Sequence, residues 1–533
     1  MEKNILDLRK KMDLLEQEFI PYGFNKAKID LKVLDRLKDK ENGKLILVTA
    51  INPTPAGEGK TTVSIGLTQG LNEIGKKAIV ALREPSLGPV FGVKGGATGG
   101  GKSSVTPQDD INLHFTGDLH AITSANNLLS ALIDNHIFHG NELELETVTW
   151  TRAIDINDRS LREIETPVRK DGFVITAASE VMATLALSSD LEDLKMRLNR
   201  ILIGYNKNDE PVFLHQLGGA DSMVMLLKDA INPNLVQTID GVPAFIHCGP
   251  FANIAHGCNS LVATRMALKL ADYTVTEAGF GADLGMEKFL HLKMPYLNKT
   301  VDAVVLVATI RALKAHGGAE NFNVYDLEAL KRGMPHLEHH LKNIKGLGLN
   351  YVIALNHFYN DSQEEVNYLM NWAKENNHPI ALSKGFAEGG KGTTDLANLV
   401  VQMANRPNNF KPLYDETLSV KEKVDKIAKT MYGAKEVVFT KKATEQLKKY
   451  KEFGWNLPVC MAKTPLSLSG DASLKGVPQD FTLTIQEIRP SFGAGFLVAR
   501  TKGIMIMPGL NKTPRAMDFR IDKDGNVTEV ERD

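Results

Sequence analysis

Residues 54–62 form a glycine-rich stretch that is suited to holding phosphate groups. The ordinary P-loop pattern is G-x-x-x-x-G-K-[ST], and the chain departs from it only at the first position, where threonine replaces glycine. Glycines let backbone N–H groups turn toward phosphate oxygens, the lysine reaches the outer phosphates, and the threonine after it can bind Mg²⁺. The predicted nucleotide-binding residues are Thr54, Pro55, Ala56, Gly57, Glu58, Gly59, Lys60, Thr61 and Thr62. The alternative is an ordinary turn between a strand and a helix.

Arg83 is a second candidate for chemistry, because it follows the next predicted strand, Lys77–Leu82. Ligands of open α/β sheets bind at the carboxyl ends of strands, where a guanidinium can clamp a carboxylate or phosphoryl group. Beyond it, residues 92–101 contain six glycines, with Lys94 among them. We expect no stable helix or strand there, but a loop that approaches a ligand. A disordered surface loop is the alternative.

Two phenylalanines stand in polar loops directly after short apolar runs. Phe358 follows Tyr351–Leu355, and Phe386 follows Ile380–Leu382. An exposed aromatic ring at the carboxyl end of a strand can stack on a flat ligand. Packing in the core is the alternative for either ring.

Histidines and cysteines form two short clusters that raise the question of a metal site. His114, Asp118 and His120 lie within seven residues, a spacing that is only suggestive of metal binding. Cys248 and Cys258 each stand near a histidine, but their spacing matches no usual zinc framework. Small buried thiols are the alternative.

The stretch Asn206-Lys207-Asn208-Asp209 matches the N-K-x-D signature with which many P-loop GTPases bind guanine. It lies between an apolar run, Ile201–Tyr205, and a second one that begins at Pro211. A hairpin turn between two strands explains the same residues without a ligand.

The elements that must position these residues alternate between strand and helix. Lys44–Ile51 predicts a buried strand, Lys60–Ile74 a helix and Lys77–Leu82 the next strand, which together make a βαβ unit. Four further pairs of a strand and the helix after it are predicted. They are Phe173–Ala177 with a helix through Leu187, Val301–Ala308 with Ile310–His316, Tyr351–Leu355 with Glu364–Lys374, and Ala434–Phe439 with Ala443–Lys451. We predict an α/β fold with mostly parallel sheets. It would comprise a P-loop NTPase-like domain over residues 1–330 and further α/β domains over 331–445 and 446–533.

Composition favours a soluble cytoplasmic protein. The net charge of −1 over 533 residues provides no electrostatic basis for binding nucleic acid or an anionic membrane. The apolar run Val301–Ile310 contains Asp302 and is far shorter than a membrane span. Met1–Lys11 lacks an apolar signal core, and three cysteines are too few for a disulfide scaffold.

Taken in order, segments along nearly the whole chain resemble the formate–tetrahydrofolate ligases, also called formyltetrahydrofolate synthetases. These segments are TPAGEGKTT (54–62), LREPSLGP (82–89), KGGATGGG (94–101), HFTGDLHAI (114–122), EAGFGADLG (277–285), KTPLSLS (463–469), RPSFGAGF (489–496), MPGL (507–510) and IDKDG (521–525). Because only 43 residues precede the first predicted strand, the resemblance is to the free-standing bacterial form.

The resemblance implies that ATP phosphorylates formate to formyl phosphate, which then formylates nitrogen ten of tetrahydrofolate and leaves 10-formyltetrahydrofolate, ADP and phosphate. Lys60 and Arg83 would be catalytic, and Thr61 would hold Mg²⁺ through the nucleotide. Glu84, Asp118, Phe358 and Phe386 would bind folate, with the second domain contributing to that site. The resemblance also implies a monovalent cation, K⁺ or NH₄⁺, and a homotetramer.

Two other functions stay open on sequence grounds. A P-loop ligase that activates a larger carboxylic acid would share Lys60 and Arg83 but would not need the paired aromatic rings. A nucleotide-driven switch protein would bind guanine through residues 206–209 and would have no small-molecule substrate.

Overall fold

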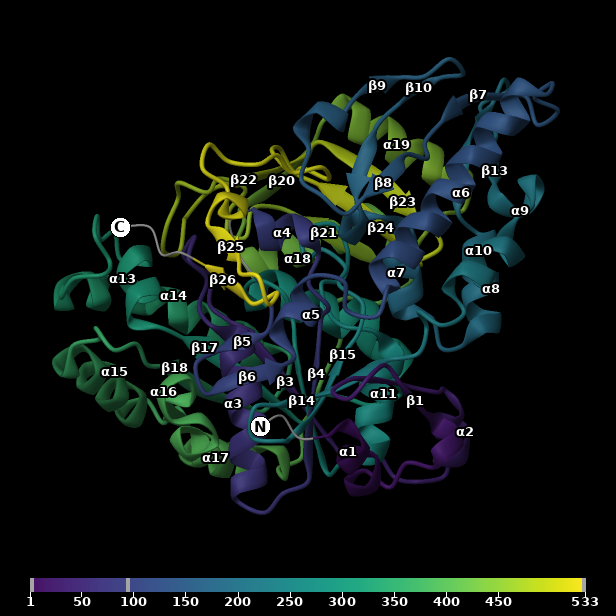
Figure 1. Cartoon of the computed structure of the whole chain (residues 1–533). Coiled ribbons are helices and arrows are strands. Elements are labelled where there is room, and N and C mark those ends of the chain that lie inside the picture. Colours follow the sequence, from purple (N-terminus) through teal and green to yellow (C-terminus); the bar gives the residue numbers. More distant parts are fainter. Residues whose placement is uncertain (1–3, 93–95, 530–533) are drawn as a thin grey trace.

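Twelve strands form one large sheet at the centre of the computed structural model, which describes residues 4–92 and 96–529 (Figure 1). In order across the sheet the main strands are β1 (Phe19–Pro21), β2 (Ala27–Ile29), β14 (Asn234–Thr238), β15 (Pro243–Ile246), β4 (Ala78–Leu82), β16 (Tyr273–Glu277), β3 (Lys44–Ala50), β17 (Ala303–Ala308), β18 (Tyr351–Asn356) and β19 (Ile380–Ser383). All neighbours from β15 to β19 are parallel, while β1, β2 and β14 pair antiparallel. The predicted α/β class with a mostly parallel sheet is therefore confirmed.

The parallel strands are apolar on both sides because helices cover both faces of the sheet. In β3, Leu45 and Leu47 join one hydrophobic core, whereas Ile46 and Val48 join another on the opposite face. Helices α3 (Lys60–Glu73) and α17 (Thr394–Ala404) pack against one face. Helices α11 (Leu261–Leu270) and α14 (Leu327–Gly346) contribute to the core of the other. This two-sided burial explains why the sequence shows continuous apolar runs rather than alternating ones.

The predicted βαβ unit is present, with β3, α3 and β4 in the expected order. Other predicted pairs are also confirmed, including β17 with α13 (Ile310–His316), β18 with α15 (Gln363–Glu375), and β20 (Glu436–Phe439) with α19 (Lys441–Glu452). The remaining helices associated with the large sheet are α1 (Ile5–Lys11), α2 (Lys32–Arg36), α4 (Leu87–Phe91), α5 (Gln108–Asn112), α12 (Met294–Leu297) and α16 (Gly385–Glu388). The kinship to P-loop NTPase folds stays a prediction.

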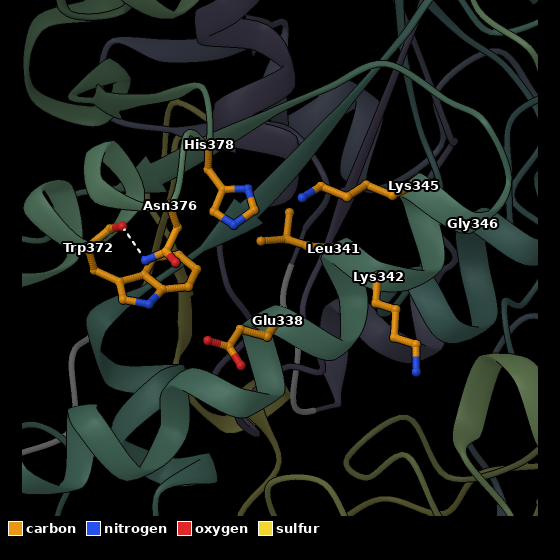
Figure 2. A pocket seen from close by; sticks show the side chains of 8 residues that line it. All are labelled: Glu338, Leu341, Lys342, Lys345, Gly346, Trp372, Asn376 and His378. Carbon is orange, nitrogen blue, oxygen red and sulfur yellow. Dashed lines mark hydrogen bonds between the residues drawn. The ribbon is translucent and has the colours of Figure 1, made fainter.

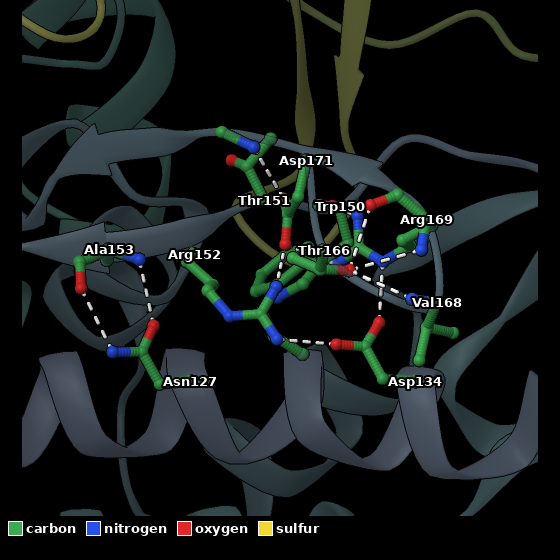
Figure 3. Close-up of polar contacts among 12 residues, drawn as sticks. Asn127, Asp134, Trp150, Thr151, Arg152, Ala153, Thr166, Val168, Arg169 and Asp171 are labelled. Carbon is green, nitrogen blue, oxygen red and sulfur yellow. Dashed lines mark hydrogen bonds and ion pairs between the residues drawn. The ribbon is translucent and has the colours of Figure 1, made fainter. Parts of the chain in front are cut away.

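A helical lobe stands beside the sheet, at the upper right of Figure 1. It comprises α6 (Asp118–Phe138), α7 (Glu180–Leu187), α8 (Leu191–Asn199), α9 (Leu214–Leu217), α10 (Ala220–Leu227), β7 (Leu145–Val148), β8 (Arg152–Ile154), β9 (Ile164–Glu165), β10 (Lys170–Asp171), β11 (Phe173–Ile175), β12 (Leu202–Asn206) and β13 (Pro211–Phe213). Figure 3 shows how α6 is attached to these strands: Asp134 and Asp171 each pair with both Arg152 and Arg169. The four charges neutralise one another where the strands cross the helix.

The C-terminal part of the chain adds small sheets rather than extending the large one. Their strands and helices are β20 with β22 (Thr482–Ile485), β21 (Val459–Ala462) with β24 (Phe496–Arg500) and β23 (Glu487–Ser491), β25 (Phe519–Ile521) with β26 (Val527–Glu529), α18 (Val420–Ile427) and α19. Strands β18 and β19 continue the large sheet across the domain boundary predicted between residues 330 and 331. The division into three domains stays a prediction.

The glycine-rich stretch 92–101 is more regular than expected, so the prediction of no strand there is wrong in part. Gly99–Gly100 forms a short strand, β5, which pairs with β6 (Ser103–Thr106), and β6 in turn pairs with β14. Gly99 adopts a φ of 78°, and a Cβ there would lie 2.3 Å from the Ser103 carbonyl oxygen. Glycine is thus needed because two backbones meet. Lys94 lies outside the described residues.

Candidate active site

The glycine-rich loop 54–62 lies at the carboxyl end of β3, in the middle of the parallel strands. Gly57 and Gly59 have φ values of 78° and 71°, a region that other residues rarely adopt. A Cβ on Gly59 would also lie 2.5 Å from Nδ2 of Asn356. Helix α3 begins at Lys60, so the positive end of its dipole faces the loop. The local geometry is that of a phosphate cradle.

Glu58 holds this loop in place through its buried side chain. Its buried carboxylate accepts hydrogen bonds from the backbone N and Oγ1 of Thr54, at 2.6 and 2.7 Å, through one oxygen. The other oxygen accepts from Thr309 and is paired with Arg311. Threonine therefore replaces the usual first glycine because its hydroxyl is needed inside the protein. The Glu58 carboxylate points into the protein, so only the backbone of Glu58 can contact a ligand on the open side of the loop. The tip of the loop, Pro55 and Ala56, is exposed.

Glu277 is a candidate functional residue that sequence analysis did not identify. It ends β16, the strand between β3 and β4, and is 5% exposed. The hydroxyl of Thr61 donates to its carboxylate at 3.0 Å. A carboxylate on the strand beside a P-loop commonly helps to hold Mg²⁺. A carboxylate and a hydroxyl are both hard oxygen donors, so this pair suits a magnesium ion. The available signal was an acidic residue that directly follows Tyr273–Thr276, a stretch rich in β-branched residues, and stands two residues before Gly279.

Arg83 follows β4, the next strand beyond β16, and lies at the same edge of the sheet as the loop. Its Nη1 donates to the carbonyl of Pro250 at 3.5 Å, and its buried Nε has no hydrogen-bond partner among the described residues. Gly279 leaves room for the guanidinium, since a Cβ there would lie 3.3 Å from Nη1. The guanidinium therefore keeps hydrogen-bonding capacity for a ligand.

Further cations make the surroundings of Arg83 electropositive. Burial lowers the pKa of His256 well below its usual value, and the charges of Lys293, Arg83 and Lys288 lower it further. The imidazole is consequently neutral, and neither ring nitrogen has a partner in the described part of the chain. Lys288 is fully buried and donates to the carbonyl of Ala252. An anion near Arg83 would be stabilised by these positive charges.

Glu84 and Asp118 are brought together, but in a buried cluster on the other side of β4. Asp118 begins α6, forms an ion pair with Lys28 at 2.8 Å and accepts a hydrogen bond from Asn234 at 2.8 Å. Burial raises the pKa of Glu84 well above its usual value, and the charge of Asp118 raises it further. Glu84 is 4% exposed and Asp118 3%, so the pair lies beneath the surface.

Phe358 and Phe386 lie beyond the ends of the neighbouring strands β18 and β19. The guanidinium of Arg311 covers one face of Phe358, with its carbon 4.0 Å from the ring centre. Phe386 is 59% exposed, and its carbonyl accepts a hydrogen bond from the backbone N–H of Lys102 at 2.8 Å. A Cβ on Gly100 would lie 3.1 Å from the Phe386 ring, so the glycine-rich stretch packs directly on it.

The four predicted folate-binding residues thus form two separate pairs. Strands β16, β3 and β17 lie between β4 and β18. Four steps of about 4.8 Å place the ends of β4 and β18 about 19 Å apart, on either side of the loop. The structure brings Phe358 and Phe386 to one side, and Glu84 with Asp118 to the other. That all four bind folate stays a prediction.

A family model described as formate–tetrahydrofolate ligase matches residues 1–531. The chain belongs to the formate–tetrahydrofolate ligase family. It is 57% identical over 519 residues to a formate–tetrahydrofolate ligase of Acholeplasma laidlawii, which covers 97% of this chain and 98% of the relative. Proteins of the same name from Bacillus licheniformis and Bacillus pumilus are 53% and 52% identical, over 98% of this chain and 96% of each relative. The protein is thus a ligase.

The structure bears on two other interpretations of the sequence, guanine binding by residues 206–209 and a metal site at the cysteines. Residues 206–209 form the hairpin between antiparallel β12 and β13, as the alternative predicted, and Asp209 pairs with Lys449. The cysteines are buried, and within residues 4–92 and 96–529 no group of three or more His, Cys, Asp or Glu side chains is placed to hold a metal. Over the same residues, no helix is both long and apolar enough to cross a membrane.

A hollow between α14 and α15 is distinct from the candidate site at the carboxyl ends of the strands (Figure 2). It has a volume of about 630 Å³ and is lined by Glu338, Leu341, Lys342, Lys345, Gly346, Trp372, Asn376 and His378. The hydroxyl of Tyr351, the first residue of β18, lies 2.7 Å from Nδ1 of His378. The hollow is therefore at the amino end of the strands, opposite the edge where α/β sheets bind ligands.

Proposed function

We propose that this enzyme uses ATP to join formate to tetrahydrofolate through formyl phosphate. A formate oxygen attacks the γ-phosphorus, and ADP leaves. Nitrogen ten of tetrahydrofolate then attacks the formyl carbon, loses its proton and expels phosphate, giving 10-formyltetrahydrofolate. The observation that carries the proposal is the hydrogen bond from Thr61 to Glu277 beneath the loop, with Arg83 on the adjoining strand. Family membership supports the choice of formate and tetrahydrofolate.

Each residue has a distinct part in this proposal. The loop amides and Lys60 bind the phosphates of ATP, and Arg83 binds the formate carboxylate and then the formyl phosphate oxygens. Phosphoryl transfer depends mainly on positioning and on charge stabilisation, which these groups supply. Thr61 and Glu277 would hold Mg²⁺, which neutralises the phosphate charge when it is bound. The buried Lys288 and Lys293 add positive potential, and the neutral His256 adds no competing anion.

Folate would bind on the side of the loop where Phe358 and Phe386 lie. The exposed ring of Phe386 supports stacking on a flat heterocycle, because it is not needed in the core. Activation by K⁺ or NH₄⁺ and assembly as a homotetramer are also proposed from the resemblance of the chain to the family, and a cytoplasmic location is proposed from its composition.

The decisive experiment measures ADP release with formate and tetrahydrofolate omitted in turn, and follows ¹⁸O from labelled formate. The proposal expects full ADP formation only when both are present, and one label in the released phosphate, because formate oxygen becomes bonded to phosphorus. Label in AMP, or unlabelled phosphate, would contradict formyl phosphate. Equal turnover with acetate in place of formate would instead favour a ligase for larger acids.

A Glu277→Gln variant tests the metal assignment in the same assay. Removing the carboxylate charge is expected to raise the Mg²⁺ concentration needed for half-maximal activity. Glu364→Gln is a matched control, because that exposed carboxylate in the first turn of α15 accepts a hydrogen bond from Tyr325 and has none with the described residues 54–62. An unchanged Mg²⁺ requirement in Glu277→Gln would remove Glu277 from the site.

A further inference from the structure

Arg311 connects the phosphate-binding loop to the aromatic side of the site. It is the second residue of α13, which follows β17 at the same edge of the sheet. Its Nη2 donates to the carbonyl of Gly57, and its Nε lies 3.4 Å from the Glu58 carboxylate. Its guanidinium carbon also lies 4.0 Å from the ring centre of Phe358. The edge of the Arg311 guanidinium therefore contacts the loop, and its flat face contacts the Phe358 ring.

The loop end of this connection is rigid. The Glu58 side chain is fully buried, and the Arg311 side chain is 19% exposed. Thr309, the N-cap of α13, donates to the same Glu58 oxygen that faces Arg311. The carbonyl of Glu58 accepts a hydrogen bond from Asn356, the last residue of β18, at 3.0 Å. A displacement of the loop would therefore be transmitted to α13 and to the end of β18.

The ring end is held in a different way. The backbone N–H of Phe358 donates to Asp361 at 2.8 Å, which fixes the main chain but not the ring. The guanidinium covers one face of the ring, so a flat ligand can stack only on the opposite face. The orientation of the ring toward that ligand thus depends on Arg311.

We propose that Arg311 is a positioning residue that couples nucleotide binding in loop 54–62 to binding of the folate ring on Phe358. The proposal rests on the function proposed above. A bound phosphate displaces the loop, the Gly57 carbonyl carries the guanidinium with it, and the guanidinium reorients the ring. Each ligand thus favours the arrangement to which the other binds, and the coupling must act equally in both directions.

Arginine suits this role better than lysine. Its planar fork reaches the Gly57 carbonyl and the Glu58 carboxylate while its flat face stays on Phe358. A lysine ammonium is a point charge and cannot keep both geometries at once. Arg311→Lys should consequently retain the charge beside Glu58 but lose most of the coupling.

The test is the dissociation constant of tetrahydrofolate, measured by calorimetry with and without saturating Mg·ADP and without formate, so that no turnover occurs. In the wild-type protein we expect ADP to tighten tetrahydrofolate by about fivefold or more, within the usual range for coupled sites. In Arg311→Met and Arg311→Lys this ratio should fall toward one. Arg332→Met is the matched control, because Arg332 donates to Gly317 at 2.9 Å and contacts neither the loop nor Phe358. It should keep the wild-type ratio.

The outcomes separate the two proposals. A wild-type ratio in both Arg311 variants, or a ratio of one in the wild-type protein, would overturn the coupling and leave the ligase function intact. Failure of tetrahydrofolate to bind the wild-type protein would overturn the proposed function, and the coupling with it. A melting curve on each sample identifies a variant that does not fold. If Arg311→Met is unfolded, the milder Arg311→Lys decides.

Discussion

Truncation of Phe386 should damage folate binding far more than stability. Complete burial of a phenylalanine side chain contributes about 1.5–3 kcal/mol. Because Phe386 is 59% exposed, only about two-fifths of this burial energy is at stake. Phe386→Ala should therefore lower the free energy of unfolding by about 1 kcal/mol at most. Stacking of a flat ring on an aromatic side chain is worth about 1–3 kcal/mol. We therefore expect tetrahydrofolate to bind about tenfold to a hundredfold more weakly.

Steady-state kinetics with each substrate varied in turn, and a melting curve on the same sample, measure both quantities. The KM for tetrahydrofolate should rise while the KM for ATP changes little, because the phosphate contacts lie in a separate loop. Phe386→Trp should be active, since it keeps an aromatic face. Phe138→Ala is the control: this ring is 74% exposed at the end of α6, and its loss should leave both KM values unchanged. An unaltered KM for tetrahydrofolate in Phe386→Ala would refute stacking.

Four further variants test other parts of the structure. Lys60→Ala should abolish ADP formation yet retain the native melting curve, because a helix start tolerates alanine; near-normal turnover would contradict the phosphate assignment. Arg83→Lys should also be inactive, since a point charge cannot replace a planar fork, and full activity would make Arg83 structural. Lys463→Met leaves the fully buried Asp283 without its partner at 2.9 Å, which should cost about 3–5 kcal/mol in urea unfolding. Burial alone would raise the pKa of Asp283, but Lys463 and the hydrogen bonds hold it below its usual value, so a loss under about 1 kcal/mol would show that the pair is weak. Burial raises the pKa of Glu180 from 4.5 to about 8, so the folded state binds the proton more tightly and stability falls as pH rises from 4.5 to 8. Glu180→Gln should flatten this decline, measured as melting temperature against pH. Parallel profiles for the wild-type protein and the variant would show that Glu180 does not cause the decline.

Local patterns were sufficient for much of the fold. The strand at Lys44–Ala50, the turn through Gly57 and Gly59, and the helix from Lys60 were all predictable, because each depends on neighbouring residues. Continuous apolar runs indicated strands buried on both faces, as in a mostly parallel sheet covered by helices. The hairpin at residues 206–209 was likewise predictable from two short apolar runs around a turn.

The order of strands in the sheet decided which residues meet at the candidate active site. Thr61 and Glu277 are 216 positions apart in the chain, and they meet only because β16 inserts between β3 and β4. Glu58 and Arg311 are separated by 253 positions and meet because β17 lies on the other side of β3. Sequence motifs identified the loop but not these partners, since a carboxylate or guanidinium carries no local sign of the strand beside which it will lie.

The same reason explains the division of the predicted folate residues. Glu84 and Phe358 were grouped through the resemblance to the family, and each stands beyond the end of a strand, a position that many residues of a parallel sheet share. Their separation depends on how many strands pair between β4 and β18, which long-range backbone hydrogen bonding determines. By itself the sequence determined which residues stand at strand ends; the tertiary structure decided which of those ends are neighbours, because strand pairing joins segments that are distant along the chain.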